Sequence, residues 1–399
     1  MSEIPRPQPL GAFPLPQGML LIDGPEHESI REQLLVGKLP ARWPEALEGN
    51  RLAFEGEYDR AIEWFAGDDS AVAKFNLFVL DPSRIERSEV VAALGEQWRP
   101  LVDYVAFTLG LTSIPPTPDN TDREIAALVW TSQAAAALDN GEEEEALAAL
   151  SNALDLAEES HPAYAAVVLT EVSGRVNDLE LAEKALALLK GTDLKAQYSE
   201  ALYQRSGLIH GLALEGRRPL QEAISGYTDA LKNLNEKDHG PLFARIHMNL
   251  GIALLAQPIM GPSDNLRAGV AVQSLRTAAR LLDEKNDSEE WASAQLNLAN
   301  ALVYAPSTHQ RDNLMEAVDT YEKVIRLRTA KSDPLGRARV LSNQGNALAH
   351  LGLLGDARLR FDEAIFLFSS NGDEDSAQVV RDLVVEIEAA ESSTEGAMS

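Results

Sequence analysis

Residues 339–368 read RVLSNQGNALAHLGLLGDARLRFDEAIFLF, and this stretch decides the fold. Its first half places one helix face at the spacing i, i+3, i+4, i+7, through Leu341, Gln344, Gly345 and Leu348. Its second half repeats the pattern on a matching face, through Ala357, Phe361 and Ala364. Gly352 and Gly355 lie between the halves and indicate a turn. The stretch therefore predicts two short helices joined by a tight turn.

Small residues let these two helices approach closely. Gly345, Ala357 and Ala364 have little or no side chain, and Phe361 fills the space that remains. This order of small, aromatic and alanine residues at fixed offsets resembles a tetratricopeptide repeat. The resemblance implies an all-α fold, a right-handed superhelical α-solenoid of tetratricopeptide-like helical hairpins, with an extended concave surface for binding.

The same pattern recurs along the chain. GNRLAFEGEYDRAIEWF from Gly49 aligns without gaps on GNALAHLGLLGDARLRF from Gly345, and both place alanine 12 residues after the glycine. Weaker copies lie between them, with anchors at Ala134 and Ala146, at Ala182 within residues 163–189, at Gly207 and Ala223, at Gly251 and Ala271, and at Ala299 and Ala317. In the longer copies we expect extra residues, including 258–264 and 306–312, to emerge on one edge of the solenoid.

Four segments follow from these patterns. Residues 1–40 form a proline-rich arm, extended or disordered to about residue 20, with an apolar patch at residues 19–22 that docks on the body and a helix near residues 27–36. Residues 41–117 form a helical region with one hairpin, in which Pro100 kinks or splits a helix over 90–111. Residues 118–373 hold about six repeats. Residues 374–399 form a capping helix and, from residue 391, a disordered acidic tail.

Composition limits the partners. The formal net charge is −27, whereas nucleic acids and anionic membranes require a basic footprint, so we expect neither as a partner. The longest apolar runs are too short for a bilayer span of ~20 residues. The chain has no cysteine, which excludes disulfides and thiolate sites. We expect a protein or peptide partner, favouring a basic one. The first residues lack a secretory signal pattern, so the cytoplasm is the expected location, with export by another route left open.

No catalytic or metal-binding pattern is evident. The seven histidines are scattered, and the sequence contains no HExxH motif, phosphate-binding glycine loop or GxSxG elbow. His210 and His247 fall at positions that face the repeat interior, where a packed histidine is more frequent than a metal ligand. We therefore expect a non-enzymatic protein without cofactor or metal.

A polar stripe follows the opposite face of the first helices. Two residues correspond to a rotation of about 200° around a helix, so positions two before the packing residues lie opposite the packing face. Three successive repeats and part of a fourth contribute to this stripe, with Arg339, Asn343 and Asn346; Ser293, Asn297 and Asn300; Arg245, Asn249 and Ile252; and Arg205. In a tetratricopeptide superhelix this face lines the concave groove.

The chemistry of asparagine suits such a groove. An amide offers donors and an acceptor, so it can pair with both the N–H and the C=O of an extended peptide. The row is similar to the asparagine ladder of kinesin light chains and bacterial peptide-pheromone receptors, and Arg245 and Arg339 would add charge-assisted bonds to acidic groups. Asn343 stands where the carboxylate clamp of chaperone-binding repeats has a basic residue, which argues against that ligand. The alternative is that these amides bond to neighbouring helices and stabilise the stack.

Three hypotheses for the function remain. The first is a scaffold or adaptor that binds an extended protein segment in its groove. The second is an assembly or maturation chaperone for a subunit of an enzyme complex, suggested by the proline-rich arm and its apolar patch. The third is a regulatory receptor that changes superhelical pitch when it binds a peptide. The sequence leaves the oligomeric state open.

Overall fold

The computed structural model describes residues 4–119, 121–258 and 261–398, with the side chains of residues 262, 263 and 388–398 outside the description. Within these ranges the regular elements are α-helices and short 3₁₀ helices, and no residue is in a strand. The fold is therefore all-α, as the sequence predicts. No helix in this part of the chain combines the length and the apolar content that a bilayer span requires.

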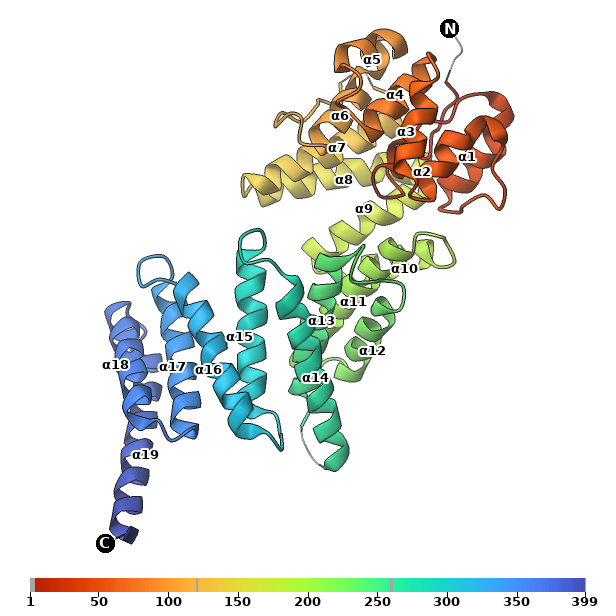
Figure 1. Cartoon of the computed structure of the whole chain (residues 1–399). Helices are drawn as coiled ribbons and strands as arrows, with labels where there is room; N and C mark the ends of the chain where they lie inside the picture. Colours follow the sequence, from red (N-terminus) through yellow and green to blue (C-terminus); the bar gives the residue numbers. More distant parts are fainter. Residues whose placement is uncertain (1–3, 120, 259–260, 399) are drawn as a thin grey trace. The chain divides into compact units, whose positions relative to one another are not determined.

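The chain forms two compact units, and the boundary lies inside α11 (Lys195–Leu214), between Ile209 and His210 (Figure 1). The first unit holds α1 (Glu28–Leu35), α2 (Glu48–Phe54), α3 (Tyr58–Ala66), α4 (Ala71–Leu80), α5 (Arg87–Leu94), α6 (Arg99–Thr108), α7 (Arg123–Asp139), α8 (Glu143–Ser160), α9 (Pro162–Arg175) and α10 (Leu179–Leu189). The second holds α12 (Leu220–Leu231), α13 (Gly240–Ala256), α14 (Pro262–Leu281), α15 (Ser288–Tyr304), α16 (Gln310–Leu327), α17 (Pro334–His350), α18 (Leu354–Ser370) and α19 (Glu374–Met398).

The helices of the second unit stack in chain order. Each helix from α12 to α19 packs against the next one along the chain, and the first helices of successive pairs also touch, α13 against α15 and α15 against α17. The same neighbour-to-neighbour packing joins α7 to α10 in the first unit. A fold in which each pair contacts its sequence neighbours is an α-solenoid.

The close approach predicted from the small residues is present. A Cβ atom added to Gly345 would lie 2.8 Å from the ring of Phe361, and one added to Gly49 would lie 2.6 Å from the ring of Phe65. A Cβ atom on Gly251 would lie 2.7 Å from Leu275. Phe361 is fully buried, as are the alanines opposite these glycines. The glycines are therefore required by packing, because even one methyl group would overfill the interface.

We expect Gly345→Ala to lower the free energy of unfolding by about 1–3 kcal/mol, because the added methyl group must displace the buried Phe361 ring. Gly269→Ala on α14 is the matched control, since a Cβ atom there meets nothing within 4 Å. The control should raise stability by about 0.5–1 kcal/mol, the usual gain of alanine over glycine in a helix. Urea unfolding followed by circular dichroism measures both, and equal effects would contradict the packing role of Gly345.

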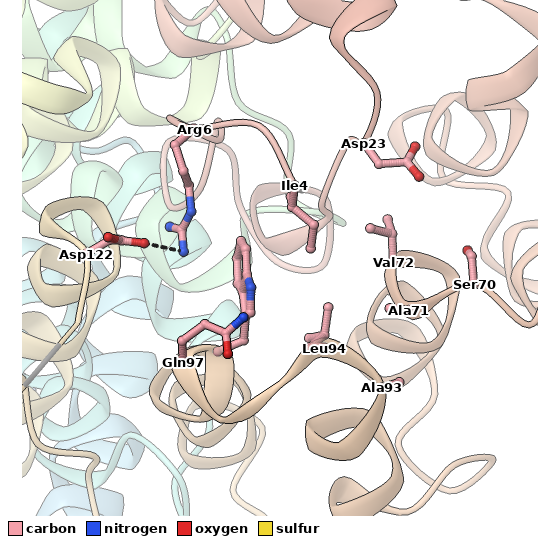
Figure 2. Close-up of a pocket in the computed structure, with 11 residues that line it drawn as sticks. Ile4, Arg6, Asp23, Ser70, Ala71, Val72, Ala93, Leu94, Gln97 and Asp122 are labelled. Atoms are coloured by element: carbon pink, nitrogen blue, oxygen red, sulfur yellow. Dashed lines mark ion pairs between the residues drawn. The ribbon is translucent and has the colours of Figure 1, made fainter. Parts of the chain in front are cut away.

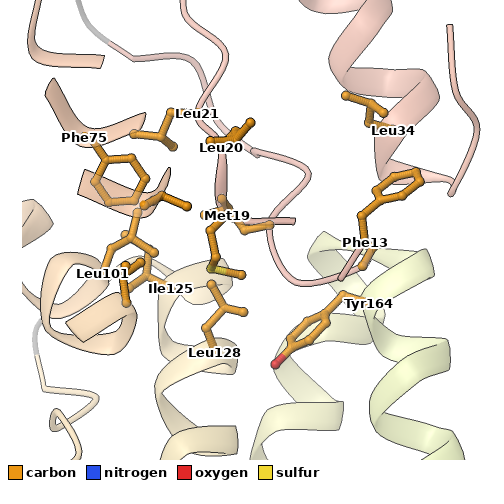
Figure 3. Packing of buried hydrophobic residues seen from close by; sticks show 14 of the residues in the cluster. Phe13, Met19, Leu20, Leu21, Leu34, Phe75, Leu101, Ile125, Leu128 and Tyr164 are labelled. Carbon is orange, nitrogen blue, oxygen red and sulfur yellow. The ribbon is translucent and has the colours of Figure 1, made fainter. Parts of the chain in front are cut away.

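The proline-rich arm is a structural part of the first unit. The predicted apolar patch is almost fully buried, and so are two further side chains of the arm; the buried residues are Leu10, Phe13, Met19, Leu20, Leu21 and Ile22. Figure 3 shows Met19, Leu20 and Leu21 between Phe75 of α4, Leu101 of α6 and Ile125 and Leu128 of α7, while Phe13 lies near Leu34. The stretch to about residue 20 was expected to be extended or disordered, and its described part, from residue 4, is packed into the unit instead of disordered. The reason is hydrophobic burial, which offsets the entropy of ordering the arm.

The expected segment boundaries at residues 40 and 117 do not separate compact units. One hydrophobic core joins residues of the arm, the 41–117 region and the first repeats, from Leu10 to Ala201. The single hairpin expected near Gly49 is present as α2 and α3. The helical array predicted for residues 118–373 begins with α7, so its first pairs belong to the same unit as the arm.

Other local expectations change in detail. The chain over 90–111 does split, but at Gly95, which has φ +100°, whereas Pro100 lies in the first turn of α6, where its missing N–H costs no hydrogen bond. The capping helix is α19, and its helical backbone continues to Met398 across the tail expected from residue 391. No proline interrupts this segment, which is rich in alanine and glutamate.

The extra residues of the longer repeats mostly lengthen helices. Helix α14 begins nine residues before Ala271 and α16 seven before Ala317, whereas α18 begins three before Ala357. In these two pairs the insertions thus add about one to two helical turns to the second helix, whereas α12 begins three residues before Ala223, as α18 does before Ala357. Residues 259 and 260 of the 258–264 insertion lie outside the described residues.

Candidate functional site

The structure brings the predicted asparagines together on the first helices of three successive pairs. We call them the amide row, and its members are Asn249 on α13, Asn297 and Asn300 on α15, and Asn343 and Asn346 on α17. All five side chains are half-buried. Direct contact of α13 with α15 and of α15 with α17 places them on adjacent elements. Arg205 lies in the first unit and is not part of the row.

Several of these amides bond between repeats. Asn343 donates to the Oδ1 of Asn300 at 3.1 Å, and Asn300 also accepts from the hydroxyl of Tyr321 at 2.7 Å. Asn346 donates to the hydroxyl of Tyr304 at 2.9 Å. Asn297 donates to the carbonyl of Ser293, one turn back on its own helix, at 2.9 Å. The row therefore contributes to stacking, since Tyr321 is fully buried and its hydroxyl needs a partner.

The same amides keep acceptor capacity. In the described part of the chain, no hydrogen bond reaches the Oδ1 atoms of Asn297, Asn343 and Asn346, whose side-chain N–H groups are engaged as above. Beside them the ring of Tyr304 is 65% exposed, and its hydroxyl is held by Asn346. This face thus offers a line of carbonyl acceptors next to an exposed aromatic ring.

The flanking arginines differ from one another. Arg245 lies 3.7 Å from Glu290, and Arg205 lies 3.4 Å from Glu183, so both have acidic neighbours within the protein. Arg339 is exposed, and it makes no ion pair with any residue that the structure describes. Its guanidinium group is therefore available to an outside acceptor at the edge of the amide row.

Comparisons with known proteins agree with a repeat fold but are distant. A scan against family models gave no match, and a search of curated proteins gave none. Among solved structures, pilF of Pseudomonas aeruginosa is similar with 17% identity and a TM-score of 0.44, covering 64% of this chain and 98% of that one. The TPR domain of P58(IPK) is similar with 15% identity and a TM-score of 0.26, covering 86% of this chain and 97% of that one.

Contacts within the chain identify the type of hairpin. Glycine meets an aromatic or leucine side chain across the helix pairs at Gly49, Gly251 and Gly345. The hairpins are tetratricopeptide-like. The described residues of this tetratricopeptide-like chain include no group of three or more His, Cys, Asp and Glu side chains placed to hold a metal ion.

Asparagines that clamp an extended backbone occur elsewhere, at positions that the sequence analysis missed. Asn76 of α4 accepts the backbone N–H of Leu21 at 2.8 Å and donates to its carbonyl at 3.0 Å. Asn50 of α2 donates to the same carbonyl at 3.3 Å. The two-sided amide pairing predicted for a bound peptide is thus realised on the protein's own arm. The available signal was an asparagine inside the apolar run AVAKFNLFVL, which the helical pattern alone leaves unexplained.

The arm also clamps itself and docks on α7. The side chain of Gln8 accepts the N–H of Ile22 at 3.0 Å and donates to its carbonyl at 2.9 Å. The N–H of Gln8 donates to the carboxylate of Glu124 at 2.6 Å. Arg6 pairs with Glu124 and, at 2.7 Å, with Asp122. Buried polar groups of the arm are therefore satisfied, which fixes its path through the core.

A cavity of about 670 Å³ lies beside the start of the arm. Figure 2 shows Arg6 and Asp122 on one side of it, Asp23 on another, and Val72 and Leu94 among its apolar walls. The guanidinium carbon of Arg6 stands 3.8 Å from the centroid of the Trp98 ring. A cavity of this size is large enough for a small ligand. The Arg6 guanidinium that faces it is already paired with Asp122 and stacked on Trp98. We therefore assign the cavity to the packing of the arm and not to a ligand.

Histidines in both units are packed. Burial lowers the pKa of His210, which lies 3.5 Å from the Tyr227 hydroxyl, and of His247, which packs on Phe243 with centroids 4.6 Å apart. His161 is almost fully buried, and its ring accepts the N–H of Tyr164 at the start of α9. Burial lowers the pKa of His161 to about 4, and the Pro9 carbonyl of the arm acts in the opposite direction.

The buried His161 predicts an acid-sensitive first unit. The pKa of His161 is lower in the folded chain than in the unfolded chain, so the unfolded chain binds the proton first as the pH falls below about 6.5. The free energy of unfolding therefore decreases with falling pH and becomes constant again below about pH 4. We expect a loss of about 2 kcal/mol between pH 7.5 and pH 5 from this group. His161→Asn keeps a capping side chain and removes the titration. Urea unfolding at both pH values tests this, and an identical pH dependence in the two proteins would contradict it.

Proposed function

We propose that this chain is a non-enzymatic scaffold that binds an extended segment of a protein partner along the amide row. The observation that supports the proposal is the set of unbonded Oδ1 atoms of Asn297, Asn343 and Asn346 on the adjacent first helices α15 and α17. An extended backbone presents N–H donors to such acceptors with little regard to its side chains. Tyr304 adds an exposed aromatic surface, and Arg339 adds an exposed guanidinium group that can donate hydrogen bonds to the partner.

The acidic composition favours a basic partner. A net charge of −27 attracts a basic partner over long distances, whereas Arg339 binds one acidic or carbonyl group of that partner at short range. Both effects can act together, because the charge of the whole surface attracts the partner and individual contacts fix its position along the row. The maturation-chaperone alternative rests on the proline-rich arm and its apolar patch, and both are accounted for by burial in the core of the first unit, so they no longer favour it. The receptor alternative has no observation in its favour.

The test uses a library of random 12-residue peptides displayed on phage and selected against the full chain. Enriched peptides are then titrated against the wild type and the variants Asn346→Ala and Arg339→Ala. We expect each variant to weaken binding about three- to tenfold, because each removes one hydrogen-bonding group from a shared row. Neither residue takes part in the buried hydrogen bond from Tyr321 to Asn300, so both variants should fold.

Arg326→Ala is the control, because Arg326 is an exposed arginine of the same unit, on the second helix of its pair. Binding that weakens for Asn346→Ala and Arg339→Ala but not for Arg326→Ala supports the row. Failure to enrich any peptide, or equal affinity for all four proteins, overturns the proposal.

A further inference from the structure

A second cavity, of about 400 Å³, lies in the first unit. Its walls come from α6, α7, α8, α9 and α11, and Gly11 of the arm also lines it. Ala135 lines it and follows the anchor Ala134 by one residue, as Asn346 follows Gly345 on α17. The packing anchor Ala134 lines the cavity too, so the cavity reaches both faces of α7, and its side chains are quite different from the amide row.

Three hydroxyl groups line this cavity, those of Thr131, Tyr164 and Tyr104, and the first two use their protons within the protein. Thr131 donates its only hydroxyl proton to the Leu128 carbonyl at 2.7 Å. The Tyr164 hydroxyl, 2.8 Å from the Thr131 oxygen, must then be the donor in that pair. The Tyr104 hydroxyl lines the same cavity. Burial raises the pKa of both tyrosines, which keeps them as neutral phenols with oxygen lone pairs to offer.

The remaining polar groups are acceptors as well. Thr170 donates to the Ala166 carbonyl at 2.9 Å, and Gln197 uses one amide proton on the Ala12 carbonyl at 3.2 Å. Glu171 and Glu200 also line the cavity, where Glu171 accepts a bond from Arg175 at 2.7 Å and Glu200 accepts one from Gln204 at 3.1 Å. A carboxylate has about four acceptor sites, so the bond from Arg175 leaves Glu171 able to accept further donors. Acceptors thus outnumber donors in the cavity.

Apolar side chains supply the rest of the wall. Leu138, Leu150, Val167 and Val168 line the cavity together with the two carboxylates. A ligand that matches this arrangement has a long apolar stem and ends in a cation with several N–H donors. A neutral amide fits poorly because it lacks the positive charge that the carboxylates attract. An anion fits poorly because it would bring further acceptors to a cavity that already has two carboxylates.

We infer that this cavity is a specificity pocket for a lysine or arginine side chain of a protein partner. The stem lies on the valine and leucine wall, and the cationic head meets the oxygens of Tyr104, Tyr164, Glu171 and Glu200. The two tyrosine rings add attraction to a cation. This pocket is independent of the amide row, since the two sites lie in different units and share no residue.

The test is a titration of the full chain, with methyl groups of valine and leucine labelled for NMR. The probes are the N-acetyl, N-methylamide derivatives of lysine, Nε-acetyl-lysine and norleucine. Their side chains have similar alkyl stems and differ in the terminal group. We expect saturable shifts of the Val167, Val168 and Leu138 methyl signals with the lysine probe. Affinity for the two neutral probes should be at least about tenfold lower, since they lack the charge-assisted bonds.

The variant Glu171→Gln with Glu200→Gln keeps the shape of these two side chains and removes their charge. We expect it to weaken binding of the lysine probe at least about tenfold. Glu144→Gln, an exposed residue of α8 outside the cavity, is the matched control and should leave binding unchanged. Equal affinity for lysine and norleucine, an unaffected double variant, or no saturable shift with the lysine probe would each overturn the inference. Loss of peptide binding at the amide row would not affect these results.

Discussion

Deleting residues 4–22 is expected to unfold the first unit. Six apolar side chains of the arm are buried there, and each contributes about 1.5–3 kcal/mol, so their sum of roughly 10 kcal/mol or more rivals the whole stability of a typical domain. Limited proteolysis followed by mass spectrometry should show cleavage throughout residues 24–209, in regions protected in the intact chain. Wild-type protection of these residues after the deletion would show that the arm is only a surface attachment.

Point variants on the arm separate burial from chain length. Leu21→Ala should cost about 2–5 kcal/mol, because Leu21 is fully buried at the amide clamp of Asn76 and the change leaves a cavity. Leu15→Ala, at a partly exposed position of the same arm, should cost well under half of that. Thermal unfolding followed by circular dichroism measures both. Similar losses for the two variants would contradict the assignment of the arm to the core.

Replacing Arg6 with alanine should have the second largest effect. Glu124 is almost fully buried and depends on Arg6 and on the N–H of Gln8 for compensation. Removing one partner of a buried pair typically costs about 3–5 kcal/mol, because the remaining charge is left in a poorly solvated place. Arg123→Ala is the control, since Arg123 pairs with Glu159 at the exposed surface and should contribute under about 1 kcal/mol.

The pH dependence of this variant has a definite sign. Burial raises the pKa of Glu124 even with Arg6 present, so the folded chain holds this proton more firmly than the unfolded chain does. Without Arg6 the pKa of Glu124 should rise further. The stability lost in Arg6→Ala should be largest at pH values above this pKa, and it should shrink as the pH falls and Glu124 is protonated. Urea unfolding of Arg6→Ala at pH 7.5 and pH 5 measures this. A penalty that grows toward pH 5 would exclude Glu124 as its source.

The fold was predictable because its determinants are local. The spacing of Gly345, Ala357 and Phe361 is set by helix geometry, and the same spacing identified the distant copy at Gly49, where Phe65 meets the glycine as Phe361 meets Gly345. The order of helices followed from this repeat, since each pair packs on its neighbours in the chain. Helix lengths were less predictable, because the extra residues before Ala271 and Ala317 read equally well as loop or helix.

The arm was not predictable in the same way. Five prolines within residues 5–16 suggest an extended chain, but nothing local reveals that Leu21 will be held by Asn76, 55 residues away. The same limit applies to the candidate sites. The sequence placed Asn300 and Asn343 on one face, yet whether their amides serve a ligand or each other depends on the distance between α15 and α17. The cavity near Tyr104 depends on long-range contacts too, since α6 belongs to no repeat.

The central claim is that a partner lies along the amide row of the second unit. Photo-crosslinking tests it most directly, with benzoylphenylalanine in place of Tyr304 and a peptide enriched by the selection described above. The control carries the same group in place of Phe366, an equally exposed residue on α18. We predict a crosslink from position 304 and none from position 366. A peptide that crosslinks from position 366, or one that binds without crosslinking from position 304, would contradict the account.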